Sequence, residues 1–507
     1  MSPLPEQPII HEVNTRVWLR EVQRSIGRPV GLDGVPKDAW DRIAPHGIDA
    51  VWLMGVWERS GVGRDIALRD PELRRSFTEA LPDVRDDDIA GSPYCVRSYT
   101  VDEALGGAAG LAAARTELAG RGIGLLLDYV PNHVAPDSPW LTEHPEYFVR
   151  GTVDDLGRDP AAYLEAGGQV FARGRDPFFP PWPDVVQLNA FRPGMREATA
   201  DVLTRIGGMC DGVRCDMAML LMNDVFARTW GHLAGPPPDS EFWPAVLAAV
   251  RQRRPGMTFI AEAYWDLEWA LQQQGFDYCY DKRLYDRLLH ERAVSVFQHL
   301  QADVSYQRRL VRFLENHDEP RAASVMGASE ERAAAVAVAT LPGATLWHEG
   351  QFTGRRTRLP VFLTRRPDEP SDADLQAFHE QLLAAVHRSG MRTGHWEPLH
   401  CEGWADNPTH HDLLAWGWRG TAGTFLTIVN LSAHGSQARI RLPWPDLGTA
   451  TCRLADLLDG TRYERPGSEL TGPAFYVDLA AWRTHVFTVE TRRSPSGAAA
   501  LSRAPIP

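Results

Sequence analysis

The chain has 507 residues, of which 44% are hydrophobic and 23% charged, and its formal net charge is −13. This length exceeds one ordinary core but suits a large barrel with one or two smaller domains, and the composition favours a soluble globular protein. The excess of acidic side chains argues against nucleic acid as a partner, because phosphate binding needs a concentrated basic face.

Three further features bear on the compartment. The six cysteines are scattered without a C-x-x-C pair, which predicts neither a disulfide framework nor a zinc site. The first eight residues show neither a basic lead nor an apolar run, so we expect no secretory signal. The longest uncharged run, 333–348, contains Pro342-Gly343 and is shorter than the roughly 20 residues of a membrane span. We therefore expect a cytoplasmic protein without a membrane partner.

Short apolar runs alternate with helical patterns through the first 390 residues, which is typical of βα units around a parallel sheet. Eight runs are strand candidates: 9–14, 50–54, 124–130, 212–215, 258–261, 276–278, 311–314 and 345–347. Each is followed by helical sequence, and the last helix has Ser371 or Asp372 as its cap and Gly390 as its stop. The pattern predicts a (β/α)8 TIM barrel over residues 1–390, with its chemistry on the loops that follow the strands.

Two intervals are too long for a bare βα unit and predict insertions, at about 57–107 after the second strand and 134–189 after the third. Both leave from the barrel face that carries active sites, so they would wall a cleft. Beyond residue 390 the pattern becomes alternating, which predicts a C-terminal antiparallel β-sandwich domain over 395–490. Residues 491–507 are rich in Ala, Ser and Pro and predict a disordered tail.

Polar residues cluster where four predicted strands end. The third strand runs into Asp128 and His133, and the fourth into Arg214 and Asp216. The fifth ends at Glu262, and the seventh leads into His317 and Asp318. Any one of these could be a structural ion pair, a capping residue or an ordinary turn. Their joint placement at successive strand ends predicts three carboxylates and two histidines at one barrel mouth.

Four stretches resemble the four signature regions of the α-amylase family, glycoside hydrolase family 13. They are 127–133 (LDYVPNH), 212–216 (GVRCD), 259–262 (FIAE) and 313–318 (FLENHD). The resemblance implies that Asp216 is the nucleophile, Glu262 the general acid/base and Asp318 a transition-state stabiliser in a retaining double displacement.

The resemblance also implies a set of residues that hold the sugar ring. The family positions that bind this ring are matched by Asp128, His133, Arg214 and His317. Tyr94 resembles the aromatic platform on which the ring stacks. The nearby Tyr99 could be that platform instead, and Tyr94 could be an ordinary tyrosine of the core. Many starch-degrading members carry a Lys-His pair after the nucleophile that contacts the acceptor and helps to bind calcium. Met219 and Leu220 stand there instead, so we expect an altered acceptor side, no metal at that site and no other cofactor, although Asn132 matches another calcium position.

A basic string follows the eighth strand and could meet an anionic group of the substrate. Arg355 and Arg356 are its candidates, with Arg358, Arg365 and Arg366 nearby. A solvated loop whose arginines pair with surrounding acids is the alternative, and Arg supplies nearly all basic charge in this chain, so the cluster alone is a weak indication.

Three functions remain open from the sequence. The first is a retaining α-glycosidase or transglycosylase whose partner is a small carbohydrate, an α-glucoside or a short α-glucan. The second is glycosyl transfer that involves phosphate or a phosphorylated sugar. The third is an inactive carbohydrate-binding or scaffold protein, which the presence of all three acids disfavours.

Overall fold

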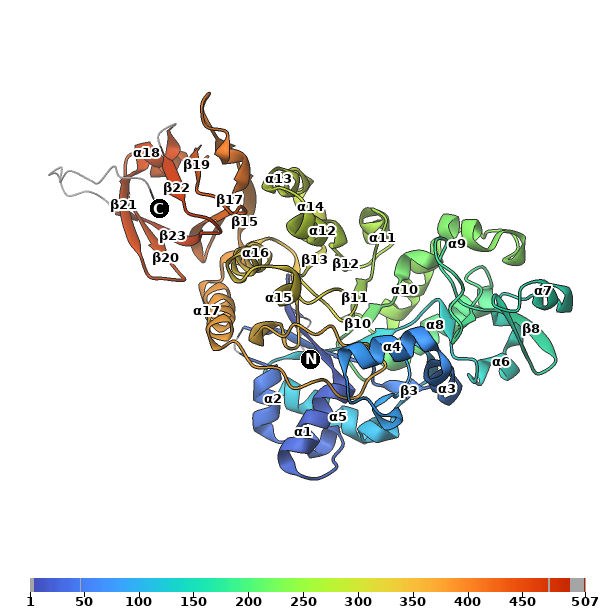
Figure 1. Cartoon of the computed structure of the whole chain (residues 1–507). Helices are drawn as coiled ribbons and strands as arrows, with labels where there is room; N and C mark the ends of the chain where they lie inside the picture. The colour runs from blue at the N-terminus through green and yellow to red at the C-terminus, as the bar shows by residue number, and fades with distance from the viewer. Residues whose placement is uncertain (1–3, 46, 473–474, 493–505, 507) are drawn as a thin grey trace.

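A closed barrel of eight parallel strands lies at the centre of the computed structural model, which describes residues 4–45, 47–472, 475–492 and 506 (Figure 1). The strands are β1 (Ile9–Asn14), β2 (Ala50–Met54), β5 (Gly124–Tyr129), β10 (Gly212–Cys215), β11 (Thr258–Ala261), β12 (Tyr278–Tyr280), β13 (Leu310–Arg312) and β14 (Ala344–His348). Their order around the barrel is β1-β14-β13-β12-β11-β10-β5-β2. The predicted (β/α)8 barrel is therefore confirmed.

The barrel strands are apolar on both faces because helices cover the outside and side chains fill the inside. The covering helices are α1 (Thr15–Ile26), α2 (Lys37–Ile43), α5 (Gly107–Ala119), α8 (Pro193–Ile206), α9 (Asn223–Trp230), α10 (Phe242–Arg253), α11 (Glu268–Gln273), α12 (Lys282–His290), α13 (Ala293–Leu300), α14 (Val304–Gln307), α15 (Ala322–Val325), α16 (Ala328–Thr340) and α17 (Ala373–Ser389). Helix α17 begins after Asp372, whose side chain accepts a hydrogen bond from the Leu375 N–H, and ends at Gly390 with φ 62°.

Two barrel strands lie elsewhere than their apolar runs indicate. Strand β12 begins at Tyr278 rather than at residue 276, because Asp277 binds Arg251 and the Phe259 N–H and so ends the preceding turn. Strand β13 begins at Leu310 and ends at the buried Arg312, so it starts one residue before the predicted run 311–314 and ends two residues before its end. Phe313 is buried but lies past the last strand pairing, where the chain turns towards the barrel mouth.

Two excursions from the barrel contain their own small sheets. The first holds β3 (Trp57–Arg59), α3 (Gly61–Arg69), α4 (Pro71–Ala80) and β4 (Val96–Val101), with β3 paired to β4. The second holds β6 (His133–Val134), α6 (Trp140–Glu143), α7 (Val153–Arg158), β7 (Tyr163–Ala166), β8 (Gln169–Ala172) and β9 (Val186–Gln187), with β6 paired to β9 and β7 to β8. In Figure 1 the second excursion lies at the end of the molecule opposite the C-terminal sheets.

The C-terminal region consists of two facing antiparallel sheets. One has the order β15-β17-β18-β23-β20-β21 and the other β16-β19-β22. The elements are β15 (His395–Leu399), β16 (Cys401–Glu402), β17 (Leu413–Gly420), β18 (Gly423–Asn430), β19 (Ser436–Ile440), β20 (Thr451–Asp456), β21 (Arg462–Pro466), α18 (Gly467–Thr471), β22 (Tyr476–Leu479) and β23 (Thr484–Arg492). Alternate residues such as Ile428 and Ile440 fill the space between the sheets, which is the predicted sandwich.

The outer face of the larger sheet packs on the barrel. Trp418 is buried there and its indole N–H donates to the Thr340 carbonyl of α16 at 2.7 Å. The expected tail begins too early, because Thr491 and Arg492 continue β23. The rest of that prediction falls on residues outside the described ones, except Ile506, which forms a bridge with Val477. Within the described ranges, no helix is long and apolar enough to cross a membrane.

Candidate active site

The parallel register brings the predicted site residues together at one end of the barrel. Arg214 on β10 pairs with Asp128 on β5, so the two side chains start at the same level. The ladder continues past the strand ends, because the Asp216 N–H donates to the Tyr129 carbonyl and the Glu262 N–H to the Cys215 carbonyl. Asp216 and Glu262 therefore follow directly on adjacent strands, as the motif spacing predicts.

One guanidinium links three carboxylates at this mouth. Arg214 is buried, and its Nη1 lies 2.6 Å from Oδ1 of Asp216 while its Nη2 lies 2.8 Å from Oε2 of Glu262. Asp128 is more distant, with 3.9 Å between Oδ1 and Nη1. The rings of Trp52, Tyr94 and Tyr280 lie between 5.3 and 5.7 Å from the guanidinium carbon and enclose it. Arg214 thus holds the carboxyl groups of Asp216 and Glu262 next to one another.

Burial sets the protonation of these acids. It raises the pKa of Glu262 to about 7, because desolvation and the nearby charges of Asp216 and Asp318 outweigh the attraction of Arg214. Burial also raises the pKa of Asp216, although Arg214 opposes the shift through its charge and its hydrogen bond. For Asp128, burial raises the pKa to about 6. Glu262 is accordingly the acid that can carry a proton near neutral pH.

Two groups hold the Glu262 carboxyl in place. The hydroxyl of Tyr264 donates to Oε1 at 2.8 Å, and the Met217 N–H donates to Oε2 at 2.5 Å. Met217 has φ 39°, a left-handed conformation that is uncommon for a side chain of its size and that aims its N–H at the acid. Neither residue was among the predicted site residues, because both contacts depend on how the chain turns after its strand.

His317 is the centre of a second group. Its Nδ1 lies 2.5 Å from Oε1 of Glu12, and its Nε2 lies 2.9 Å from Oδ2 of Asp318 and 2.7 Å from the Tyr94 hydroxyl. Burial disfavours its charged form, yet Asp318 and Glu12 raise the pKa of His317 well above its usual value. For Asp318, desolvation in the cleft is outweighed by His317 and Arg214, which lower the pKa to about 2.

Glu12 is a site residue that the sequence interpretation missed. It lies on β1 and is fully buried, and its second oxygen has no hydrogen-bond partner among the described residues. The signal was present, since a carboxylate in a strand that is expected to be buried in the barrel needs a partner. Its partner, His317, is brought next to it only when the barrel closes through β14.

Tyr94 and His133 both lie at this mouth, whereas Tyr99 belongs to the core. Tyr94 stacks on His317 with ring centroids 5.4 Å apart. Tyr99 instead exchanges hydrogen bonds with the Val130 backbone. Burial lowers the pKa of His133 to about 4, opposed by the Tyr94 backbone, so His133 is a neutral imidazole beside that tyrosine.

The predicted acceptor-side residues are placed elsewhere. Met219 and Leu220 are 0% and 3% exposed and pack in the barrel core, so they do not line the cleft. Their apolar side chains turn inward because residues 218–221 form a short 3-10 turn shortly after Asp216. The residue that follows Asp216, Met217, is partly exposed.

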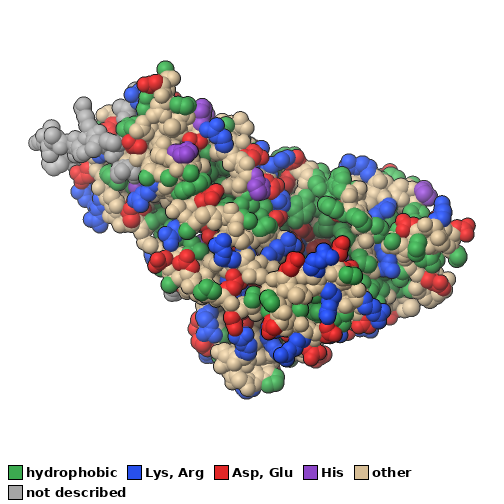
Figure 2. All heavy atoms as spheres, in the orientation of Figure 1, with side chains coloured by type: hydrophobic (Ala, Val, Ile, Leu, Met, Phe, Trp, Pro, Cys, Tyr) green, Lys and Arg blue, Asp and Glu red, His purple; other side chains and the backbone are tan. Residues whose placement is uncertain are grey.

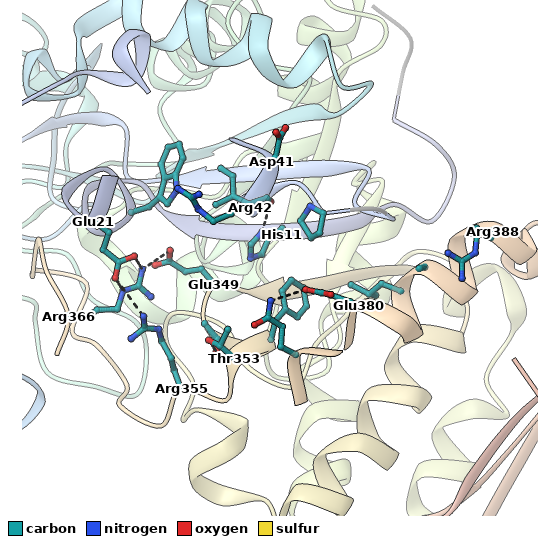
Figure 3. A pocket seen from close by; sticks show the side chains of 18 residues that line it. His11, Glu21, Asp41, Arg42, Glu349, Thr353, Arg355, Arg366, Glu380 and Arg388 are labelled. Carbon is teal, nitrogen blue, oxygen red and sulfur yellow. Dashed lines mark hydrogen bonds and ion pairs between the residues drawn. The ribbon is translucent and has the colours of Figure 1, made fainter. Parts of the chain in front are cut away.

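The basic string also runs away from the site for most of its length. Arg355 lines a cavity of about 760 Å³ on the side of the barrel, 3.7 Å from Glu21, within a network that includes Arg366 and Glu349 (Figure 3). Arg356 is exposed, and its N–H donates to Glu369. The ion pair of Arg355 with Glu21 therefore fits the paired-loop interpretation, whereas the contact of Arg356 is made by its backbone. Arg358, in contrast, is close enough to Asp318 to contribute to its low pKa.

The residues at the family's usual calcium position do not fit a calcium ion. Oδ1 of Asn132 accepts a hydrogen bond from Nε2 of Gln187 at 2.9 Å, and the second position is the buried, apolar Leu220. Calcium needs several oxygen ligands turned towards one point. Among the described residues, no cluster of three or more His, Cys, Asp or Glu side chains could hold a metal ion.

Comparison with known proteins shows which of them this chain resembles. No protein-family model matches the chain. The α-amylase MalA of Haloarcula japonica is 23% identical over 394 residues, covering 75% of this chain and 49% of that protein. This chain thus spans about half the length of that curated relative.

Solved structures extend the likeness over nearly the whole chain. The maltogenic α-amylase AmyB of Thermotoga neapolitana superposes with a TM-score of 0.68 at 18% identity, covering 96% of this chain and 100% of that one. The cyclic α-maltosyl-(1→6)-maltose hydrolase of Arthrobacter globiformis, solved with maltose, gives 0.64 at 16% identity with the same coverage.

The fold and the site define a class, a (β/α)8 barrel with a C-terminal β-sandwich and a carboxylate cluster at the mouth of the barrel. The relative and the solved structure that share this architecture with the chain are both named as α-amylases.

Proposed function

We propose that the protein is a retaining α-glycosidase or transglycosylase that acts on α-glucosides or short α-glucans. The observation that carries this proposal is the Arg214 bridge, which holds the carboxyl groups of Asp216 and Glu262 beside one another, with the pKa of Glu262 raised to about 7. Two carboxyl groups in different protonation states are what retaining double displacement requires. Free cysteines, five of the six being buried, support a reducing, cytoplasmic location.

In this mechanism Asp216 attacks the anomeric carbon and forms a covalent glycosyl-enzyme, while Glu262 gives its proton to the departing oxygen. Glu262 then takes a proton from water or from a sugar hydroxyl, which attacks the intermediate and restores the original anomeric configuration. Asp318, kept ionised by His317, binds sugar hydroxyls more tightly as the ring distorts. Arg214 stabilises the ionised nucleophile.

The proposal is tested by trapping the intermediate. Glu262→Gln cannot protonate a leaving group but should still react with α-glucosyl fluoride, whose leaving group needs no proton. Mass spectrometry should then show one hexosyl unit on the peptide that contains Asp216, and Asp216→Asn should show none. Labelling of another residue, or activity that survives in Asp216→Asn, would refute the mechanism.

Substrate choice needs a panel of α-glucosides. Trehalose, sucrose, maltose and longer maltooligosaccharides should be incubated with and without inorganic phosphate, and the products identified. Retained α-configuration in the first-formed product supports the proposal. Turnover that depends on phosphate would replace it with glycosyl transfer to phosphate, and binding without turnover would replace it with a binding protein.

A further inference from the structure

The cavity of about 760 Å³ on the side of the barrel is separate from the candidate active site (Figure 3). Helices α1, α2 and α17 contribute to its walls, together with the turn that follows β14, residues 349–355. Its described lining residues include none of Asp216, Glu262 and Asp318. Its volume falls within the range of small-molecule sites, about 300 to 1,000 Å³.

His11 on β1 lines this cavity, is 4% exposed and has a hydrogen-bond acceptor to offer. Its Nδ1 lies 2.7 Å from the carbonyl oxygen of Ile43, so Nδ1 carries the proton. Burial lowers the pKa of His11, although the Ile43 carbonyl and Glu12 oppose the shift, and the neutral ring keeps a lone pair on Nε2. Nε2 has no hydrogen-bond partner among the described residues. A ligand that donates a hydrogen bond to Nε2 would satisfy this buried atom.

Arg355 supplies the complementary donor. Its Nη2 lies 3.7 Å from Oε1 of Glu21, whereas its Nη1 is buried and has no hydrogen-bond partner in the described part of the chain. Gly350 fixes the position of this side chain. The Arg355 N–H donates to the Gly350 carbonyl at 3.1 Å, and a Cβ at Gly350, whose φ is 88°, would lie 2.5 Å from Cδ of Arg355. The glycine therefore lets the arginine stem lie against the backbone and holds the guanidinium at the cavity wall.

The charges around the cavity balance. Arg366 lies between two carboxylates, with its Nε 2.8 Å from Oε1 of Glu21 and its Nη2 3.0 Å from Oε2 of Glu349. The described lining residues include four arginine and four acidic side chains in all. On the face of the molecule seen in Figure 2, positive and negative side chains are likewise interspersed. Without an excess of either sign, the cavity favours a neutral ligand that carries both donors and acceptors.

Apolar side chains complete the walls. Trp18 and Leu383 are 6% and 2% exposed, and Phe352 is partly exposed. The rings of His11 and Phe352 have centroids 5.2 Å apart, so the unpaired acceptor lies beside an aromatic surface. A pyranose ring combines apolar C–H faces, which pack on such a surface, with hydroxyl groups that both donate and accept hydrogen bonds.

We propose that this cavity is a second ligand site, separate from the candidate active site, which binds a neutral sugar of one or two pyranose rings. One hydroxyl group of the sugar donates to Nε2 of His11, another oxygen accepts from Nη1 of Arg355, and a ring face packs beside Phe352. The site uses none of the groups assigned to catalysis, so it stands independently of the proposed function.

Hydrogen–deuterium exchange with glucose and with maltose locates the bound sugar, and the Asp216→Asn background prevents turnover during the measurement. Peptides from α1, from residues 349–355 and from α17 should exchange more slowly at millimolar sugar. Sorbitol should protect them less, because it carries hydroxyl groups but has no ring face to pack beside Phe352. Protection confined to peptides of the barrel mouth, or equal protection by sorbitol, would overturn the proposal.

His11→Phe tests the acceptor. The maltose concentration that half-protects the α17 peptides should rise about fivefold, the equivalent of one hydrogen bond. His379→Phe is the matched control. His379 is also buried, its Nδ1 lies 3.1 Å from the Leu375 carbonyl, its ring lies 5.5 Å from that of Phe352, and its Nε2 has no partner among the described residues. It is not among the residues that line the cavity, so His379→Phe should keep the wild-type midpoint.

Ala384→Trp tests the cavity itself and does not remove a buried hydrogen bond. Ala384 is a partly exposed wall residue on α17, so a larger side chain there fills the space without entering the barrel core. Protection by maltose should disappear from the α1 and α17 peptides, whereas Ala384→Ser, which leaves the space open, should retain it. Wild-type midpoints in folded His11→Phe and Ala384→Trp would overturn the second site.

Discussion

Glu12 on the first barrel strand and His317 after the seventh lie side by side, with 2.5 Å between Oε1 and Nδ1, and both side chains are buried. Through this pair a carboxylate at the bottom of the site supports the charge of an imidazole that binds Asp318 and Tyr94. Glu12 lies behind His317, so we regard it as a positioning residue.

Glu12→Gln should keep the shape and remove the charge. The pKa of His317 should then fall and that of Asp318 should rise, because each loses part of its partner's field. We expect kcat/KM to drop at least about tenfold, the equivalent of one pKa unit. Activity should also decline as pH rises through the lowered pKa of His317, which a kcat/KM–pH profile measures.

The matched control for Glu12 is Glu315→Gln. Glu315 is also buried and charged, but it pairs with Arg321 at 2.6 Å and accepts from the Ala322 N–H. The Glu315→Gln variant should have a lower melting temperature but the wild-type kcat/KM–pH profile. If both variants give the same profile, Glu12 has only a structural role.

The pH dependence of the wild-type enzyme should follow the two reacting acids. Glu262 must be protonated, so kcat/KM should fall as pH rises through about 7. Asp216 must be ionised and its pKa is raised, so activity should fall at a pH above the usual aspartate range as the medium is acidified. In Glu262→Gln, measured with α-glucosyl fluoride, the alkaline decline should disappear, and its persistence would assign that step to another group.

Tyr264→Phe should move the alkaline decline to higher pH. The hydroxyl donates to Glu262 and so favours its ionised form, and without it the pKa of Glu262 should rise. We expect a shift of several tenths of a unit or more, with kcat reduced because the acid is held less precisely. Tyr99→Phe is the control, since its hydroxyl binds only the Val130 backbone among the described residues. A shift to lower pH would contradict this hydrogen bond.

Chelation should leave activity and melting temperature unchanged. The side-chain amide of Gln187 donates a hydrogen bond to Oδ1 of Asn132, and the residue at position 220 is Leu, which cannot bind calcium. Dialysis against EDTA followed by assay with and without added calcium measures this. A loss that calcium restores would show a metal site built from other residues.

Much of the candidate active site was predictable because its residues lie at the ends of parallel strands or directly after them. Once eight βα units close, the carboxyl ends of the strands meet, so Asp128, Asp216 and Glu262 had to converge whatever the loops do. The same argument fails for Met219 and Leu220. They lie only three and four residues beyond Asp216, but a short turn points them into the core.

The sequence by itself predicted the barrel and the gathering of Asp216, Glu262 and Asp318 at its mouth, because apolar periodicity and motif spacing are local properties of the chain. Only the tertiary structure decided that Glu12 supports His317, that Arg355 lies on the side of the barrel and that Phe178 meets Trp265. Each of these depends on segments far apart in sequence whose approach is set by barrel closure and by the path of long loops. The pattern of side chains along one segment carries no information about how closely that segment approaches another one in the folded chain.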